Sequence, residues 1–371
     1  MLRMLIPALL FLVTSLHAIP PAECATLYSP NSEFSGSKAF EHIEKLTATG
    51  KRFAGSQNEK ETARYIYETM LECGITATIQ EFNVDTGDNK FRSCNVIGVK
   101  KGSSRQTICL TAHYDSVGGV GAVDNASGVG VLLELARVLA AFGCRESLIF
   151  VAFGAEETGL HGSRYYISTL EECVKDDIVA AVNIDTVGFG QRFEPGYVAE
   201  GAKLKQTPFW LLRKVYGISK DMDLDTEMYI SAVNGHHLGR KLYGYCNGQH
   251  RSDHIAFLEK GIPAVSISFG PALYSDQGGF LHSESDTPDK VSKQNLKLAG
   301  EIAVSLIEKI TNITPVPLQG AGNLGERYFI AEHEGELYGM KYVIGVALAV
   351  SSGAAALIIV LLLIKALKRA G

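Results

Sequence analysis

The sequence predicts an α/β protein whose sheet is mixed, mostly parallel and covered by helices on both faces. Four short apolar runs have the length and composition of buried strands, and they lie at residues 107–110, 147–153, 178–184 and 264–269. Segments with the apolar spacing of helices separate these runs. Strands that alternate with helices form largely parallel sheets, which need helices on both faces.

The elements before the first of these runs extend the prediction. Residues 40–46 and 59–73 have the spacing of amphipathic helices. Residues 76–84 and 91–99 are rich in β-forming side chains and predict a hairpin that turns at residues 85–89. The later helices are expected at residues 129–139, 160–170, 208–216, 253–260 and 296–310.

Both ends of the chain carry membrane-related signals. Residues 1–18 place Arg3 before an apolar run and end in small and polar residues, which is the layout of a secretory signal peptide. Residues 342–364 contain no charge and are long enough to span a bilayer as a helix. The basic residues that follow this helix are Lys365, Lys368 and Arg369.

These signals divide the chain into a signal peptide at 1–18, a globular domain at 25–312, a linker at 313–341, a transmembrane helix at 342–364 and a cytoplasmic tail at 365–371. Because basic residues stay on the cytoplasmic side, we expect a single-pass membrane protein whose globular domain faces the cell exterior or the secretory lumen. The alternative for the last helix is a buried core helix, which its length and basic flank disfavour.

Composition narrows the function classes. The chain is 46% hydrophobic and 20% charged, with a formal net charge of -5 and no block of like charges. A nucleic-acid partner is therefore not expected, because such proteins carry a basic surface. Seven cysteines include no C-x-x-C pair. Export would be compatible with disulfides, the odd number leaves at least one thiol over, and Cys109 is expected to be a buried free thiol.

The most informative polar residues follow the first apolar run. His113 and Asp115 come directly after it, and Asp124 ends a glycine-rich loop before the next helix. Open α/β sheets form their sites at the edge where such loops begin. His and Asp are suitable ligands for Zn²⁺. Asp115 is placed to accept the second ring N–H of His113 and so to fix its tautomer. Alone, this short pattern fits an ordinary polar loop better than a metal site.

Further polar residues, three acidic positions and a histidine, make a metal site the better interpretation. Glu156 and Glu157 follow the second apolar run, Asp185 follows the third, and His282 lies in the later segment F-L-H-S-E-S-D-T-P-D. Adjacent glutamates after a buried strand repel each other unless cations or protons neutralise them. A pair of zinc ions accounts for these residues together. Two such ions can share a bridging water and lower its pKa.

The motifs H-Y-D-S, G-A-V-D-N-A-S-G, A-E-E-x-G, N-I-D and H-S-E-S-D-T-P-D occur in this order between His113 and Asp289. In this combination the chain resembles the di-zinc aminopeptidases of peptidase family M28, which include the bacterial leucyl aminopeptidases. The resemblance implies a zinc exopeptidase fold (phosphorylase/hydrolase-like) for residues 25–312. It also implies peptide substrates with a free N-terminus.

The resemblance implies two zinc ions per chain, five ligands and a general base. The ligands are His113, Asp124, Glu157, Asp185 and His282. His113 and Asp185 would hold one ion, and Glu157 and His282 the other, with Asp124 between the two. Glu156 would be the general base, and Asp115 would orient His113. The family pattern also predicts a cis peptide bond between Asp124 and Asn125.

Other polar residues are expected to have structural roles. Asp253 is predicted to cap its helix and not to touch metal, and His161 to lie at a helix start. His236, His237, His250 and His254 are predicted to be loop or packing residues. Candidates for an oxyanion-stabilising tyrosine are Tyr243, Tyr245 and Tyr274. The side-chain pocket is expected in the loops at 188–201 and 231–249.

The leading function is a zinc-dependent aminopeptidase. The first alternative is a glutaminyl-peptide cyclase, which resembles this scaffold and uses one zinc. A non-catalytic receptor ectodomain is disfavoured because the five ligands and the base are all present. A carboxypeptidase of the same branch is disfavoured because such enzymes carry added domains for which this chain has no room.

Overall fold

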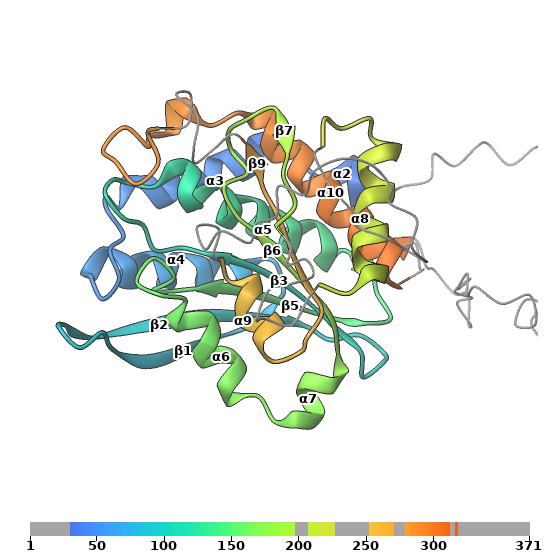
Figure 1. Cartoon of the computed structure of the whole chain (residues 1–371), viewed down its shortest axis with the longest axis horizontal. Coiled ribbons are helices and arrows are strands. Elements are labelled where there is room, and N and C mark those ends of the chain that lie inside the picture. Colours follow the sequence, from blue (N-terminus) through green and yellow to red (C-terminus); the bar gives the residue numbers. More distant parts are fainter. Residues whose placement is uncertain (1–29, 197–206, 227–251, 271–278, 312–315, 318–371) are drawn as a thin grey trace, which may run out of the picture. The chain divides into compact units, whose positions relative to one another are not determined.

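A six-stranded sheet forms the centre of the computed structural model, which describes residues 30–196, 207–226, 252–270, 279–311 and 316–317 (Figure 1). The strand order is β1-β2-β5-β3-β6-β8. The strands are β1 (Thr76–Asp85), β2 (Lys90–Lys100), β3 (Thr107–His113), β5 (Ser147–Phe153), β6 (Ile178–Ile184) and β8 (Ala264–Ile267). Strands β5, β3, β6 and β8 are parallel, and the β1–β2 hairpin pairs antiparallel with β5. The predicted mixed sheet is confirmed.

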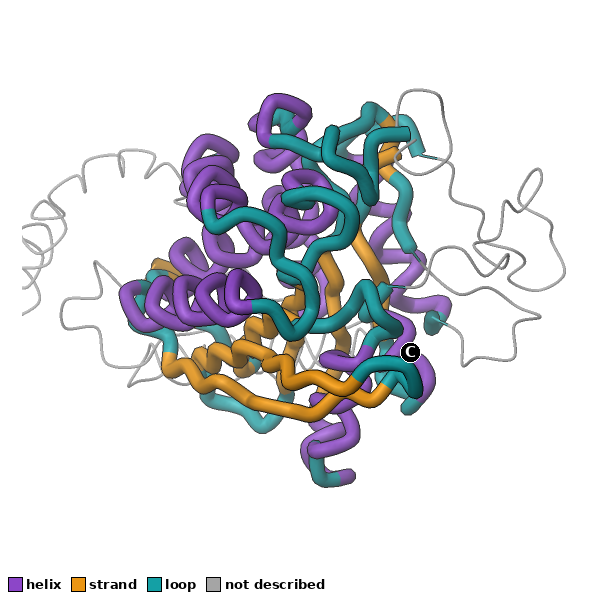
Figure 2. Tube along the Cα trace, turned by 90° about the vertical axis from the view of Figure 1, so that its left-hand side faces the viewer, coloured by secondary structure: helices purple, strands orange, loops and turns teal. Residues whose placement is uncertain are grey.

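Helices lie on both sides of this sheet (Figures 1 and 2). One side carries α3 (Gly36–Ala48), α4 (Gln57–Glu72), α5 (Ser127–Ala140), α8 (Phe209–Asp221) and α10 (Lys293–Thr311). The other side carries α6 (His161–Thr169), α7 (Glu172–Asp177) and α9 (His254–Glu259). The shorter elements are α2 (Pro30–Glu33), β4 (Phe142–Gly143), β7 (Arg192–Phe193), β9 (Phe269–Gly270), β10 (Val316–Pro317) and the single turns η1 (Ala122–Ala126) and η2 (Pro288–Lys290).

Strand β5 shows why the apolar runs are continuous. Its side chains alternate between two apolar clusters, with Phe150 and Ala152 in the cluster beneath α5 and Val151 and Phe153 in the cluster beneath α6 and α9. Because both faces of the strand are buried, alternation between polar and apolar residues is absent. The larger cluster draws on α3, α5 and α10, so the helical spacing predicted from the sequence buries one side of the sheet.

The predicted elements agree closely with the observed ones, and the differences concern short segments. Helix α7 and the two-stranded β7–β9 sheet were not predicted, because elements of two to six residues leave little periodicity to detect. Strand β8 ends at Ile267, earlier than predicted, and Phe269 pairs instead with β7. Cys109 is a buried free thiol, as predicted.

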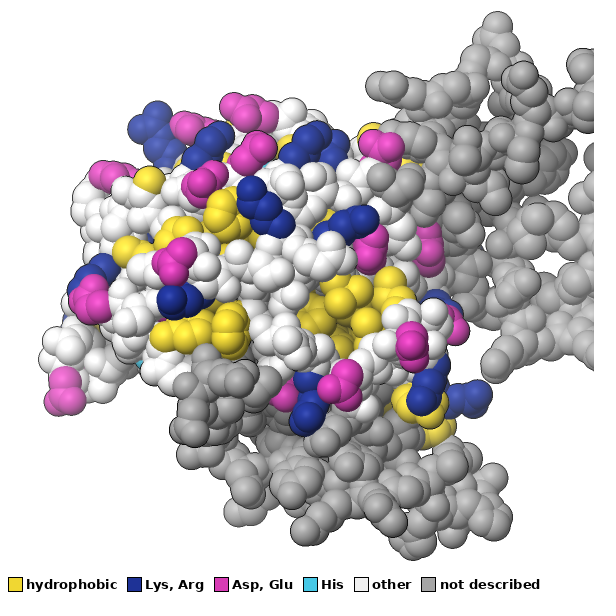
Figure 3. Space-filling model, turned by 90° about the horizontal axis from the view of Figure 1, so that it is seen from above, with side chains coloured by type: hydrophobic (Ala, Val, Ile, Leu, Met, Phe, Trp, Pro, Cys, Tyr) yellow, Lys and Arg dark blue, Asp and Glu magenta, His cyan; other side chains and the backbone are white. Residues whose placement is uncertain are grey.

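The membrane-related predictions fall on other residues. The signal peptide at 1–18 and the helix at 342–364 lie outside the described residues. Among the described residues, no helix is both long enough and apolar enough to cross a bilayer. On the face drawn in Figure 3, acidic and basic side chains are interspersed, and hydrophobic side chains are exposed in several separate areas.

Candidate metal centre

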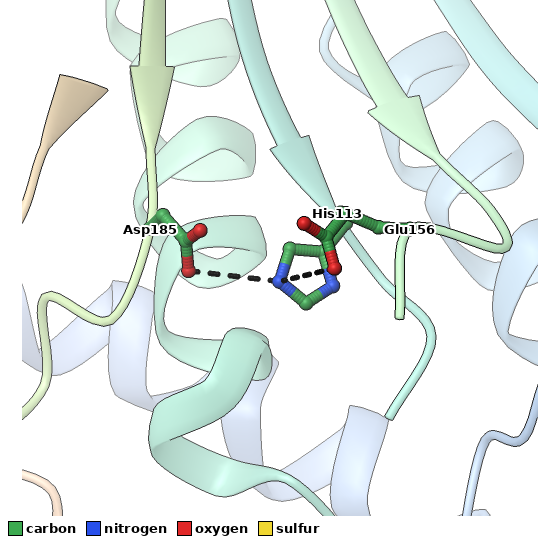
Figure 4. A group of neighbouring side chains, drawn as sticks. All are labelled: His113, Glu156 and Asp185. Atoms are coloured by element: carbon green, nitrogen blue, oxygen red, sulfur yellow. Dashed lines mark ion pairs between the residues drawn. The ribbon is translucent and has the colours of Figure 1, made fainter. Parts of the chain in front are cut away.

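Three neighbouring parallel strands bring polar side chains together at their carboxyl ends. His113 is the last residue of β3, Glu156 lies just beyond the end of β5, and Asp185 directly follows β6. Figure 4 shows the three side chains converging from these strands. The Nε2 atom of His113 lies 3.6 Å from Oδ1 of Asp185 and 4.0 Å from Oε2 of Glu156. The strand register therefore creates this half of the centre.

The carboxylate of Asp115 fixes the turn that presents the two glutamates. Its Oδ1 accepts the backbone N–H of Glu156 at 3.0 Å, and its Oδ2 accepts that of Glu157 at 3.2 Å. The same Oδ1 lies 3.5 Å from Nδ1 of His113, so Nε2 is the ring nitrogen that faces the acidic cluster. Asp115 is fully buried. One carboxylate thus holds the backbone N–H groups of both glutamates and lies beside the ring of His113.

Asp124 lies between two histidines that belong to different loops. Its Oδ1 is 3.2 Å from Nε2 of His113, and its Oδ2 is 3.0 Å from Nε2 of His282. His282 Nε2 is also 3.4 Å from Oε2 of Glu157. The peptide bond between Asp124 and Asn125 is cis, as predicted. The two carboxylate oxygens of Asp124 therefore face two separate sets of donors.

The donor atoms have the spacing that metal ligands require. Two groups, His113–Glu156–Asp185 and His113–Asp124–Glu157, bring their ligand atoms within 4.8 Å of one another. A tetrahedral zinc ion with bonds of about 2.0–2.2 Å holds its ligand atoms roughly 3.3 Å apart. Oε1 of Glu157 and Oδ1 of Asp185 are buried and have no hydrogen-bond partner among the described residues. The residues present therefore fit zinc.

The electrostatics show a cluster that needs added positive charge. Burial raises the pKa of Glu157 to about 9 and the pKa of Glu156 well above its usual value. The hydrogen bond to Asp124 raises the pKa of His282 to about 9. For Asp124, burial is outweighed by the hydrogen bonds from His113 and His282, so its pKa is lowered. Bound cations would replace these protons, so metal binding should release protons.

The structure brings together all seven residues that the sequence proposed for the site.

One prediction of a structural role is wrong, because Asp253 occupies the N-cap position of α9 without making a side-chain capping hydrogen bond. The side chain of Asp253 is fully buried instead, and burial raises its pKa to about 7. His254 is buried at the start of α9, and His161 begins α6, both as expected.

The remaining candidates and most of the predicted pocket loops lie outside the described residues. These candidates are His236, His237, His250, Tyr243, Tyr245 and Tyr274.

Several supporting residues were not predicted. Ser252 donates a hydrogen bond to Oδ2 of Asp185. The amide of Asn125 donates to the carbonyl of Ile184 and accepts the N–H of Thr186, which ties the loop of Asp124 to the end of β6. Asn125 could have been found because it stands inside the motif G-A-V-D-N-A-S-G.

The fold and the buried cluster define an α/β protein built to hold metal ions at the carboxyl edge of its sheet. A sequence model described as Peptidase family M28 matches residues 95–307, which is more than half of the chain. The chain therefore belongs to peptidase family M28.

Among its relatives, Aminopeptidase YwaD of Bacillus subtilis is 30% identical over 219 residues, which cover 58% of this chain and 44% of that protein. The chain spans about half the length of the curated relatives that it matches. A likeness of this extent supports the family assignment and leaves the activity of the whole protein to be tested.

Two solved structures show how widely this fold is used. A zinc aminopeptidase from Bacillus subtilis, BSAP, has a TM-score of 0.62 and 19% identity, and the match covers 78% of this chain and 97% of that one. An Acidobacteriales glutaminyl cyclase also has a TM-score of 0.62, with 21% identity and coverage of 76% and 96%. Because the two scores are equal, these likenesses establish the fold and do not separate the two activities.

Proposed function

We propose that this protein is a zinc-dependent aminopeptidase that hydrolyses the N-terminal peptide bond of peptides. The observation that carries the proposal is the position of Asp124, whose two oxygens face His113 at 3.2 Å and His282 at 3.0 Å. Asp185 accompanies the first histidine and Glu157 the second. A carboxylate that faces two sets of donors is suited to bridge two metal ions.

Each residue of the site then has a defined task. His113 and Asp185 would hold one zinc ion, and Glu157 and His282 the other. Bound zinc would supply Lewis acidity and would lower the pKa of a water molecule. Glu156 takes a proton from the attacking water and passes it to the leaving amine.

The proposal requires two zinc ions per chain, because five ligands exceed the four that a single tetrahedral ion takes. Protein prepared without chelator should therefore contain close to two equivalents of zinc by elemental analysis. It should release the first residue from a panel of aminoacyl amides. The panel includes N-terminal glutamine, because the second candidate is a glutaminyl-peptide cyclase. A single zinc together with cyclisation of N-terminal glutamine would establish that alternative.

We also propose that the catalytic domain faces away from the cytoplasm and is held by a single helix at residues 342–364. The support is in the sequence, where residues 1–18 have the layout of a secretory signal peptide and basic residues directly follow the apolar run. Its substrates would then be peptides outside the cell or in the secretory lumen.

A further inference from the structure

A buried arginine holds the loop that leads to the metal centre. Arg52 lies between α3 and α4, and none of its surface is exposed. Its Nε donates to the carbonyl of Tyr114 at 2.7 Å, its Nη1 to that of Val120, and its Nη2 to that of Gly121 at 3.0 Å. All three acceptors belong to residues 114–124, called here loop 114–124, which connects β3 to Asp124. The guanidinium therefore joins the start of this loop to Val120 and Gly121, shortly before Asp124.

A buried carboxylate holds the same loop through its N–H groups. Oδ1 of Asp286 accepts the backbone N–H of Val123 at 2.7 Å, and Oδ2 accepts that of Asp124 at 3.1 Å. Asp286 is only 1% exposed, and it lies four residues after His282. One side chain thus connects the backbone of Asp124 to the segment that carries its histidine partner.

Arg52 binds backbone carbonyls of loop 114–124, and Asp286 binds backbone N–H groups of the same loop. We propose that Arg52 and Asp286 are a pair of positioning residues that set the distance between Asp124 and His282 for zinc binding. This inference rests on the proposed zinc site, although it concerns the affinity of that site and not the reaction. Neither residue can serve as a ligand in this arrangement, because both are occupied by the main chain of loop 114–124.

The charge of Arg52 adds to this role. Burial lowers its pKa to about 10, while the carboxylates of Asp115, Asp286 and Asp124 favour its charged form. Arg52 therefore stays cationic at neutral pH. A fixed internal cation next to the acidic cluster reduces the repulsion among the carboxylates before metal binds. Since a guanidinium is planar and has five N–H donors, it can hold three carbonyls where an ammonium cannot reach them all.

The test compares R52M, R52K and D286N with the matched control E134Q. Glu134 is likewise a fully buried carboxylate that accepts a backbone N–H, that of Ser35 at 3.0 Å, and it lies in α5 ten residues beyond Asp124. The readouts are the zinc dissociation constants of the apoprotein from chelator competition, the free energy of unfolding, and kcat and KM as zinc is increased.

We expect R52M and D286N to weaken zinc binding by roughly 10–100-fold, as loss of supporting residues around metal sites does. The zinc affinity of R52K should lie between those of R52M and the wild type, because lysine keeps the positive charge but lacks the planar set of N–H donors. Added zinc should restore most of kcat in these variants, and E134Q should bind zinc as the wild type does.

Two results would overturn the inference. One is wild-type zinc affinity in both D286N and R52K. The other is a loss of affinity in E134Q that equals the loss in D286N at the same unfolding free energy, since the effect would then be general destabilisation. Should R52M fail to fold, D286N and R52K decide the question. A wild-type protein that binds zinc but releases no N-terminal residue would refute the proposed function alone.

Discussion

The metal centre has two halves that are built in different ways. The strand-end half consists of His113, Glu156 and Asp185, which leave three adjacent parallel strands. The loop half consists of Asp124 and His282, which are carried by loops that other polar side chains hold in place. The first half is set mainly by the hydrogen bonds of the sheet, with Asp115 holding the turn of Glu156, and the second by a few buried side-chain contacts.

This difference teaches which parts of the centre tolerate change. Strand ends are fixed by many cooperative backbone bonds, so a single substitution nearby leaves the strand register intact. A loop held by single side chains loses its geometry when one of them is removed. Substitutions around the two halves should therefore differ in their effects.

The largest effect is expected at the strand-end half, from Glu156→Gln. The amide cannot transfer the proton, and general acid–base groups contribute about 10²–10⁴-fold to the rate. Zinc content should stay near that of the wild type, because Glu156 is not one of the proposed ligands. Steady-state kinetics and elemental analysis on the same preparation check both points. Glu157→Gln serves as the comparison and should lose zinc. More than about a tenth of normal activity in Glu156→Gln would exclude this residue as the base.

The next effect compares a histidine from each half. His113 lies beside Asp124 and Asp185, whereas His282 lies beside Asp124 and Glu157. In the proposed assignment each histidine holds a different zinc ion, so His113→Ala and His282→Ala should each keep about one equivalent, since three ligands suffice for an open zinc site. Elemental analysis after dialysis against zinc-free buffer measures the zinc that each variant retains. Loss of both ions in either variant would show that the two halves bind metal as one unit.

The sequence was sufficient for the strand-end half. Apolar runs of four to seven residues identified the strands, and the polar residue after each run then had to lie at one edge of a parallel sheet. His282 and Asp124 follow no such rule: the glycine-rich loop and the later polar segment drew attention to them, and the family motifs supplied their expected roles as ligands. The structure supplied their spacing, which depends on contacts between residues more than 150 positions apart in the chain, such as that between Val123 and Asp286.

The supporting residues show where sequence reasoning stops. Arg52 lies in the stretch T-G-K-R-F-A-G, where nothing distinguishes a buried arginine from a solvated one. Asp253 precedes a helix, so capping was the reasonable expectation, and the tertiary structure buried its side chain instead. Polar residues in loops have no periodicity, and their partners are known only once the fold is built.

Two glycines with positive φ test how closely the loops of the metal centre pack. Gly118, with φ of +74°, packs so closely that a Cβ would overlap the carbonyl oxygen of His282. Gly87, with φ of +86°, has a similar backbone but nothing within 4 Å of its Cβ position. Gly87→Ala should cost about 1–2 kcal/mol of unfolding free energy from backbone strain alone. Gly118→Ala should cost clearly more and should also weaken zinc binding. The two variants are compared by urea unfolding and chelator competition, and equal costs would contradict the close packing of the loops.

A pH-dependent effect on stability is expected from Glu59, whose carboxyl group lies close to Gly154 at the end of β5. Glu59 is buried and accepts the N–H of Gly55 and the hydroxyl of Ser93, each at 2.6 Å. Burial raises the pKa of Glu59 from 4.5 to about 7. Between these values the folded chain keeps a proton that the unfolded chain has released. The contribution of Glu59 to stability therefore falls as the pH rises from 4.5 to 7, and it is constant above.

Glu59→Gln should remove this slope, which amounts to about 3 kcal/mol over the whole interval. The measurement is the free energy of unfolding at several pH values for the variant and the wild type. The difference between the two chains isolates Glu59 from the other titrating groups. Parallel curves would show that Glu59 is ionised in the folded protein across this range.

The smallest effect on catalysis is expected from removing the C-terminal segment. The proposed ligands, the base and the residues that hold loop 114–124 all lie before residue 290, within the part of the chain that the structure describes. A chain that ends at Gly325 keeps all of them and lacks the predicted membrane helix. Its kcat/KM on small peptides should therefore stay within a few-fold of the full-length value. In membrane fractionation the shortened chain should appear in the supernatant, whereas the full-length chain should appear in the pellet.

The control is the full-length variant Leu357→Lys, because a charge at the centre of the helix costs about 2.5–3.5 kcal/mol of insertion free energy without shortening the chain. If the shortened chain lost its zinc, the segment after Gly325 would belong to the catalytic domain, and the tether would have to be abandoned.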